Sequence, residues 1–176
     1  MAIINISTVP ELSVDTPKPV RNPLEFKMET NNYVIFIAGQ KTIVTVGFDD
    51  IYDMEVGDQF TATLESTVVT FTIVASPSNE NEVLPRSAFP GGIMGSNNYG
   101  VHLQSKFIGH SVIGAKFTST YVYAGMDDTH TDIELKSILN EPLSLVFAKV
   151  SGDYSLSSTI NQNGIFDKYE DRPTVS

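Results

Sequence analysis

Four residues past the middle of the chain have side chains that could bind a divalent cation. Asp127, Asp128, His130 and Asp132 lie within six residues of one another, and carboxylate oxygens with an imidazole nitrogen can form a ligand set for such ions. A helix–loop–helix calcium site needs alternating ligands, a glycine and a closing glutamate, and this segment lacks that pattern. Its spacing therefore favours a solvated acidic turn. We therefore expect no bound metal and no other cofactor. Residues 49–58 form a second acidic stretch, which we interpret as a connection between strands.

Catalytic motifs are absent from the sequence. The chain has no cysteine, and its three histidines, His102, His110 and His130, stand in no recognised catalytic pattern. It contains no Gly-x-Ser-x-Gly elbow, no phosphate loop with its lysine and no His-Glu-x-x-His pair. Two carboxylates could still converge in space to hydrolyse a sugar, but no pair is singled out. We expect that the protein is not an enzyme, with a wall-degrading hydrolase as the least favoured alternative.

The charge balance argues against two classes of partner. The 176 residues include 11 Lys and Arg against 21 Asp and Glu, which gives a net charge of −10. Nucleic-acid backbones and anionic membrane surfaces attract proteins with a surplus of cations, so we expect neither as a partner. No run of about 18 apolar residues suits a membrane-spanning helix, and the first residues lack the features of a secretory signal peptide.

Runs of β-branched and aromatic residues predict strands across most of the chain. Alternating polar and apolar residues predict a first strand over 24–29, and paired runs predict hairpins at 33–46 and 59–74. Residues 76–100 are rich in turn formers, with four glycines among the last twelve, and predict one long loop. Further strands are predicted within 102–123 and over 143–149. Residues 133–140 fit either a short helix or a strand.

These elements predict an all-β fold. We expect an antiparallel β-sandwich or barrel of about eight to ten strands, with at most one short helix and extended terminal arms. The predicted domain spans residues 24–150 and includes the long loop 76–100. Residues 1–23 carry four prolines and form the predicted N-terminal arm, and residues 151–176 form the predicted C-terminal arm.

The N-terminal arm and the aromatic residues of the loop are the predicted contacts with other molecules. Pro17, Pro19 and Pro23 hold the arm extended in advance, which reduces the entropy lost on docking. Phe89 and Tyr99 flank the glycine-rich run. Because aromatic side chains are enriched at interfaces, we expect these two to be exposed anchors.

A short pattern near the start of the chain points to a family. Residues 20–33, VRNPLEFKMETNNY, join an Asn-Pro-Leu-Glu-Phe opener to an alternating strand and a polar turn. This pattern resembles the opening of structural proteins encoded by tailed phages and prophages of Bacteroidota, and residues 68–83 resemble a later strand and loop of the same family. The resemblance covers about the first half of the chain and does not extend beyond residue 100. It implies a tail or tail-junction component of the virion and transfers no catalytic residues.

Two functions follow from the resemblance and the predicted arms. We expect a structural subunit of a tailed phage virion, in the tail, the collar or the head–tail junction, which assembles into an oligomeric ring. Its partners would be copies of itself and other virion proteins, and its location would be the virion. The alternative is a receptor- or glycan-binding module on a particle, which requires an exposed surface at Phe89 and Tyr99.

Overall fold

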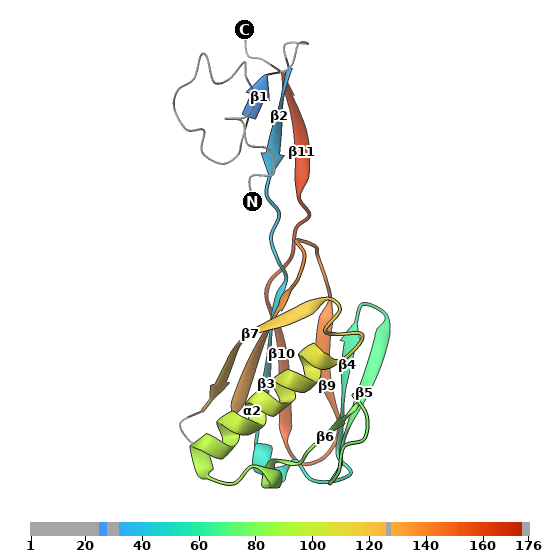
Figure 1. The fold of residues 1–176 in the computed structure, drawn as a ribbon, viewed down its shortest axis with the longest axis vertical. Helices are drawn as coiled ribbons and strands as arrows, with labels where there is room; N and C mark the ends of the chain where they lie inside the picture. The colour runs from blue at the N-terminus through green and yellow to red at the C-terminus, as the bar shows by residue number, and fades with distance from the viewer. Residues whose placement is uncertain (1–24, 28–31, 126–127, 174–176) are drawn as a thin grey trace. The chain divides into compact units, whose positions relative to one another are not determined.

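The computed structural model describes residues 25–27, 32–125 and 128–173 and divides the chain into two compact units (Figure 1). Unit 1 contains residues up to Gln40 together with those from Ile165 onward. Unit 2 contains Lys41–Gly164. The predicted N-terminal arm, residues 1–23 with Pro17, Pro19 and Pro23, lies outside the described residues.

Unit 1 is built from both ends of the chain. Its antiparallel sheet has the order β1 (Glu25–Lys27), β2 (Asn32–Ile37) and β11 (Lys168–Pro173). The buried ring of Phe36 on β2 lies 5.3 Å from the ring of Tyr169 on β11. Strand β1 is described for the three residues around Phe26, which pair with Tyr33, Val34 and Ile35 of β2.

Unit 2 contains two four-stranded sheets around a shared core. The first has the order β10-β3-β8-β7 and the second the order β6-β5-β4-β9. Every pair is antiparallel except β5 and β6, which are parallel. The strands are β3 (Ile43–Asp49), β4 (Gln59–Leu64), β5 (Thr67–Ile73), β6 (Glu82–Val83), β7 (Phe117–Ala124), β8 (Thr131–Ser137), β9 (Leu145–Ser151) and β10 (Ser155–Gln162).

The predicted fold class is confirmed as a mostly antiparallel β-sandwich, and the sheets do not close into a barrel among the described residues. The predicted hairpin at 59–74 is also confirmed, because β4 pairs with β5 around a turn at Glu65. Along β4 and β8, alternate side chains are buried, as expected of strands with one face in the core.

Three expectations about individual segments are wrong, and one open alternative is decided. The runs at 33–46 do not form a hairpin, because β2 belongs to unit 1 and β3 pairs with β8 and β10 in unit 2. Of the two alternatives for residues 133–140, a short helix or a strand, the strand is the one that forms, as β8 over residues 131–137. The predicted C-terminal arm, 151–176, contains β10, a full strand of the first sheet. The predicted loop 76–100 runs into a helix that also replaces the strand expected at 102–108.

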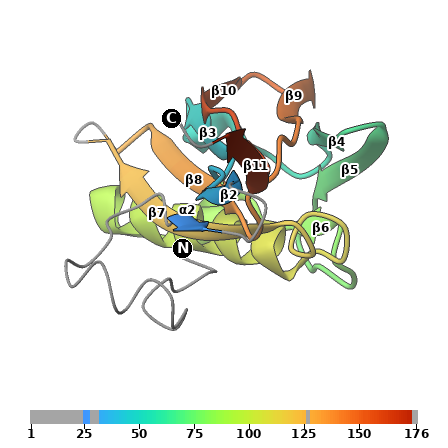
Figure 2. The ribbon, with the colours of Figure 1, turned by 90° about the horizontal axis from the view of Figure 1, so that it is seen from above.

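This helix, α2 (Gly92–Gly109), is the largest departure from the sequence-based expectation. Two short 3₁₀ helices, η2 (Ile51–Asp53) and η3 (Arg86–Ala88), accompany it. Tyr99, Leu103 and Phe107 recur every four residues and are fully buried, which gives α2 one face in the core. Seen from above, α2 lies along one side of unit 2, opposite β3 and β10 (Figure 2). No helix among the described residues has the length and apolarity needed to cross a membrane.

The core of unit 2 is centred on a cluster of phenylalanine rings. Phe107 of α2 has its ring centroid 4.9 Å from that of Phe147 on β9 and 5.5 Å from that of Phe71 on β5. It also lies 6.1 Å from Phe60 on β4 and 6.4 Å from Phe48 on β3. The helix therefore supplies a ring that contacts strands of both sheets.

Gly100 allows α2 to approach the first sheet closely. A Cβ atom at this position would lie 2.7 Å from Cγ1 of Val122 on β7 and would overlap Oγ1 of Thr131 on β8. Glycine weakens a helix interior by about 1 kcal/mol relative to alanine. Here the close packing of the helix on β7 and β8 requires it.

We expect Gly100→Ala to lower the free energy of unfolding by about 1–3 kcal/mol, because the added methyl group overpacks the contact with β7 and β8. Gly109→Ala is the matched control, since nothing lies within 4 Å of a Cβ at that position. This variant should be neutral or stabilising by up to about 1 kcal/mol. Urea denaturation followed by circular dichroism measures both, and equal effects would contradict the close packing.

Candidate functional site

His130 lies between two carboxylates on the outer face of the first sheet. Its Nδ1 contacts Oδ1 of Asp49 at the end of β3, and its Nε2 lies 3.0 Å from Oδ2 of Asp132 on β8. Gly47 leaves room for this group, because a Cβ there would lie 2.8 Å from Asp132 Oδ1 and 3.6 Å from His130 Cε1. Both ring nitrogens face carboxylates, so neither is left to activate a nucleophile. The arrangement suits a charged ion pair that links β3 to β8.

The surroundings of His130 favour its charged form. Partial burial lowers its pKa, but the hydrogen bonds to Asp132 and Asp49 and their negative charges raise it by more. The net result is a pKa above the ordinary value of 6.5. The ion pair between β3 and β8 therefore persists to a higher pH than an isolated histidine would allow.

The four predicted metal candidates do not form one site. His130 and Asp132 join Asp49, whereas the Asp128 carboxylate accepts a 3.1 Å hydrogen bond from the Tyr52 hydroxyl. Asp127 lies outside the described residues. Within residues 25–27, 32–125 and 128–173, no group of three or more acidic or histidine side chains is arranged to hold a metal ion.

Arg86 of η3 is a buried cation that sequence reasoning did not single out. Its guanidinium group donates to the carbonyl oxygens of Phe89 and Gly92, the second at 2.9 Å, and to Oγ of Ser96 at 3.1 Å. It also donates to the Tyr52 hydroxyl at 3.0 Å and lies 4.4 Å from the centre of that ring. These contacts hold the segment 86–92 against the start of α2, which indicates a structural role.

The other two histidines attach loops to α2. His110 is buried, with Nε2 2.7 Å from Oδ1 of Asn81 and with Nδ1 accepting a hydrogen bond from the Val112 amide. His102 accepts a hydrogen bond of 3.1 Å from the Leu84 amide, and burial, with a smaller contribution from Lys106, lowers its pKa. Both rings therefore act as structural links.

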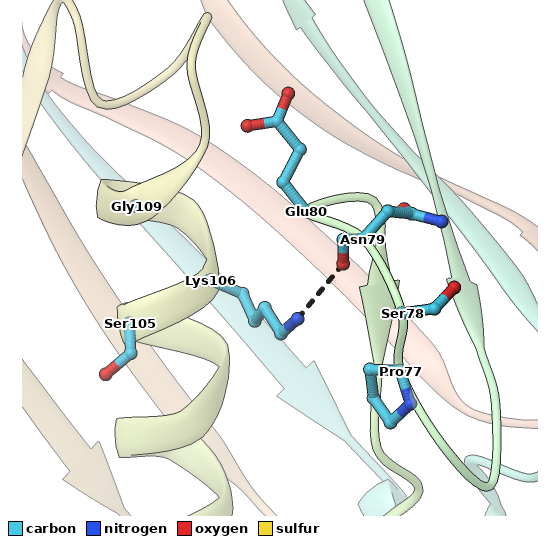
Figure 3. Close-up of a pocket in the computed structure, with 7 residues that line it drawn as sticks. All are labelled: Pro77, Ser78, Asn79, Glu80, Ser105, Lys106 and Gly109. Carbon is cyan, nitrogen blue, oxygen red and sulfur yellow. Dashed lines mark hydrogen bonds between the residues drawn. The ribbon is translucent and has the colours of Figure 1, made fainter.

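An open groove of about 350 Å³ lies between residues 77–80 and the last turns of α2 (Figure 3). Lys106 donates to the Asn79 carbonyl across it at 3.3 Å. The Glu80 carboxylate accepts bonds from the side chain and the amide of Ser111, which lower its pKa. The lining combines a lysine and a glutamate with small polar side chains. It offers no nucleophile paired with a base.

The expectation that Tyr99 is an exposed anchor is wrong. Its side chain is fully buried, its hydroxyl lies 3.5 Å from Sδ of Met54, and burial raises its pKa. Phe89 is partly buried, with its ring 5.6 Å from that of Tyr99 and 5.2 Å from that of His102. These two residues therefore do not form the exposed aromatic surface that a glycan-binding module would need.

The solvent-exposed face of α2 is the surface that sequence reasoning missed. Its exposed apolar side chains are Ile93, Met94, Val101 and Ile108. Met94, Val101 and Ile108 are spaced seven residues apart, which places them on one side of the helix. Lys106 is the only Asp, Glu, Lys or Arg in the 18 residues of α2. The seven-residue spacing can be read from the sequence, but it defines one face only if the segment is a helix, and the sequence predicts a loop and a strand there.

Comparison with known proteins gives no relative from which a role could be transferred. No family model matches the chain, and no curated protein shows significant similarity to it.

We expect His130→Asn to destabilise the protein most at low pH. Since the folded-state pKa is raised above the unfolded value, the stabilisation is fully present below about pH 6.5 and is lost as the pH rises through the folded-state pKa. In urea denaturation, the difference in midpoint between wild type and variant should be larger at about pH 6 than at about pH 9.

His102→Gln is the control, because its effect on stability should change with pH in the opposite direction. The folded-state pKa of His102 is lowered, so its contribution to stability is present at high pH and falls as the pH drops below about 6.5. A pH-independent difference for His130→Asn would show that the ion pair with Asp49 and Asp132 does not form in solution.

Proposed function

We propose that the protein is a structural subunit that assembles with copies of itself into a ring in the virion of a tailed phage. Its place there would be the tail, the collar or the head–tail junction, in contact with other virion proteins. The likeness of residues 20–33 and 68–83 to phage structural proteins supports the virion assignment. The exposed apolar face of α2 is the observation that supports self-assembly.

The α2 face has the composition of an interface that a partner covers. Met94 is 76% exposed. Val101 and Ile108 follow on the same side of the helix, each about two turns further along. Soluble monomers seldom expose contiguous apolar surface of more than a few hundred Å², and larger patches mark interaction sites. Covering these side chains removes apolar area from water, which favours association by about 25 cal/mol per Å² before the costs of binding.

The charge distribution favours a second copy as the partner on this face. Each chain carries a net charge of −10, so two copies repel one another over most of their surfaces. The exposed side of α2 carries no carboxylate, and its polar members are Asn97, Asn98 and Ser105. Contact through this face therefore brings copies together without placing acidic side chains directly against one another.

Native mass across a range of concentrations tests the proposal. We expect a defined oligomer to form as the concentration of purified protein rises, in mass photometry and in light scattering after gel filtration. Electron microscopy of the same samples should show closed rings. A single-copy mass at every concentration would overturn the proposed assembly.

Met94→Glu and Val101→Glu should each weaken self-association by at least about tenfold, because each variant leaves an unpaired carboxylate within the contact. Val68→Glu is the matched control, since Val68 is 61% exposed on β5, away from α2. Equal effects of all three substitutions would indicate a general response to added charge and would contradict the α2 interface.

A further inference from the structure

The outer edges of the three sheets differ in how they are protected against pairing with another strand. Unpaired backbone groups at a sheet edge attract further strands, and proteins guard them by shortness, charge, proline or cover. Strand β1 has three described residues. Strand β6 has two residues, which pair with Thr72 and Ile73 and leave residues 67–71 of β5 without a strand on that side. Strand β11, KYEDRP, combines four charged residues with a proline. Strands β9 and β10, which end the two sheets of unit 2 on one side, lie against each other.

Strand β7 lacks most of these protections. It has eight residues, FTSTYVYA, with no charge and no proline, and it ends the first sheet with no strand beyond it in the described parts of the chain. A bulge between Ser119 and Tyr121 interrupts its pairing with β8, but both flanking segments remain paired. Tyr121 and Tyr123 are exposed, and their rings stack at 6.2 Å. This edge therefore offers backbone groups and an aromatic surface to an additional strand.

Residues 2–9 have the composition of such a strand. The segment AIINISTV contains no charged residue, and five of its eight residues are β-branched. From Ile4 to Thr8 it alternates β-branched residues with Asn5 and Ser7, the period of a strand with two different faces. The 15 residues between this segment and β1 can span up to about 50 Å when extended, which is enough to reach a neighbouring molecule.

We propose that residues 2–9 of one copy add as a strand to the β7 edge of the next copy. This inference rests on the assembly proposed above and names the segment that joins its subunits. Backbone hydrogen bonds to an open edge supply affinity, and the side chains on alternate positions supply specificity. Because the segment and the β7 edge are different surfaces of each copy, the contact is head-to-tail and can close into a ring.

A second β7 strand is the competing occupant of the edge. Pairing of β7 with β7 would use the same surface on both copies and would end at a dimer. It would also leave residues 2–9 without a role. The head-to-tail arrangement accounts for both the unprotected edge and the uncharged segment.

The absence of cysteine from the chain allows a clean disulfide test. Donor variants Ile4→Cys, Asn5→Cys and Ile6→Cys are each mixed with acceptor variants Thr118→Cys or Tyr123→Cys, whose native side chains are exposed on β7. Donor and acceptor chains carry tags of different mass, so that mixed dimers are distinguished after oxidation. A disulfide requires Cβ atoms within about 4.5 Å, which only side chains on the same face of neighbouring strands achieve.

We expect mixed dimers with an alternating pattern, in which Ile4→Cys and Ile6→Cys behave alike and Asn5→Cys behaves oppositely. Val68→Cys is the control acceptor, since it is exposed on the part of β5 that β6 does not cover and therefore tests a second open edge. It should give no mixed dimer if the segment adds to β7. Equal yields at all three donor positions, or dimers of the acceptor variants alone, would overturn the proposal. A further variant carries a donor and an acceptor cysteine on the same chain. Disulfides formed only within single chains of this variant would also overturn the proposal.

Deleting residues 2–9 separates this inference from the proposed function. We expect the shortened chain to lose the closed ring while its urea midpoint stays unchanged. A shortened chain that assembles like the wild type would overturn the strand addition and leave the α2 interface standing. A single-copy mass for the intact chain at every concentration would instead overturn the assembly itself.

Discussion

The ring of Phe107 lies between two sheets that share no hydrogen-bonded pair of strands within the described residues. It contacts Phe71 and Phe147 in one sheet and Phe48 in the other, so apolar burial joins layers that backbone hydrogen bonds do not. A buried phenylalanine contributes about 2–3 kcal/mol through the area removed from water, with further gain from edge-to-face ring contacts. The position of α2 thus sets how the two sheets of unit 2 meet.

The requirement for this helix explains several less obvious residues. Gly100 brings the helix axis near β7 and β8, and Arg86 anchors the segment that leads into its first turn. His102 and His110 hold neighbouring loops along its length. The titratable groups around α2 are therefore occupied by internal hydrogen bonds. Its outer side, by contrast, exposes the apolar side chains of Met94, Val101 and Ile108.

The sequence predicts the strands correctly where apolar and polar residues alternate and every second side chain is buried. Phe60, Ala62 and Leu64 show this on β4, and the short turn before β5 limits the pairing to one register. The helix was missed because glycine and asparagine are poor helix formers, whereas packing of Tyr99 and Leu103 overrides that local preference. Likewise, the contact of His130 with Asp49 joins residues 81 positions apart, a proximity created by the pairing of β3 with β8.

The side chain of Thr42 ties together the two places where the chain enters and leaves unit 2. Its Oγ1 accepts hydrogen bonds from the Leu143 amide at 3.1 Å and the Gly164 amide at 3.0 Å, and Gln162 donates to the Lys41 carbonyl at 2.8 Å. The first and last residues of this 124-residue stretch are therefore neighbours in space. Such a body has the geometry of a cassette. It can be spliced into a surface turn of an unrelated host, or reconnected end to end and opened elsewhere, with little disturbance to either backbone.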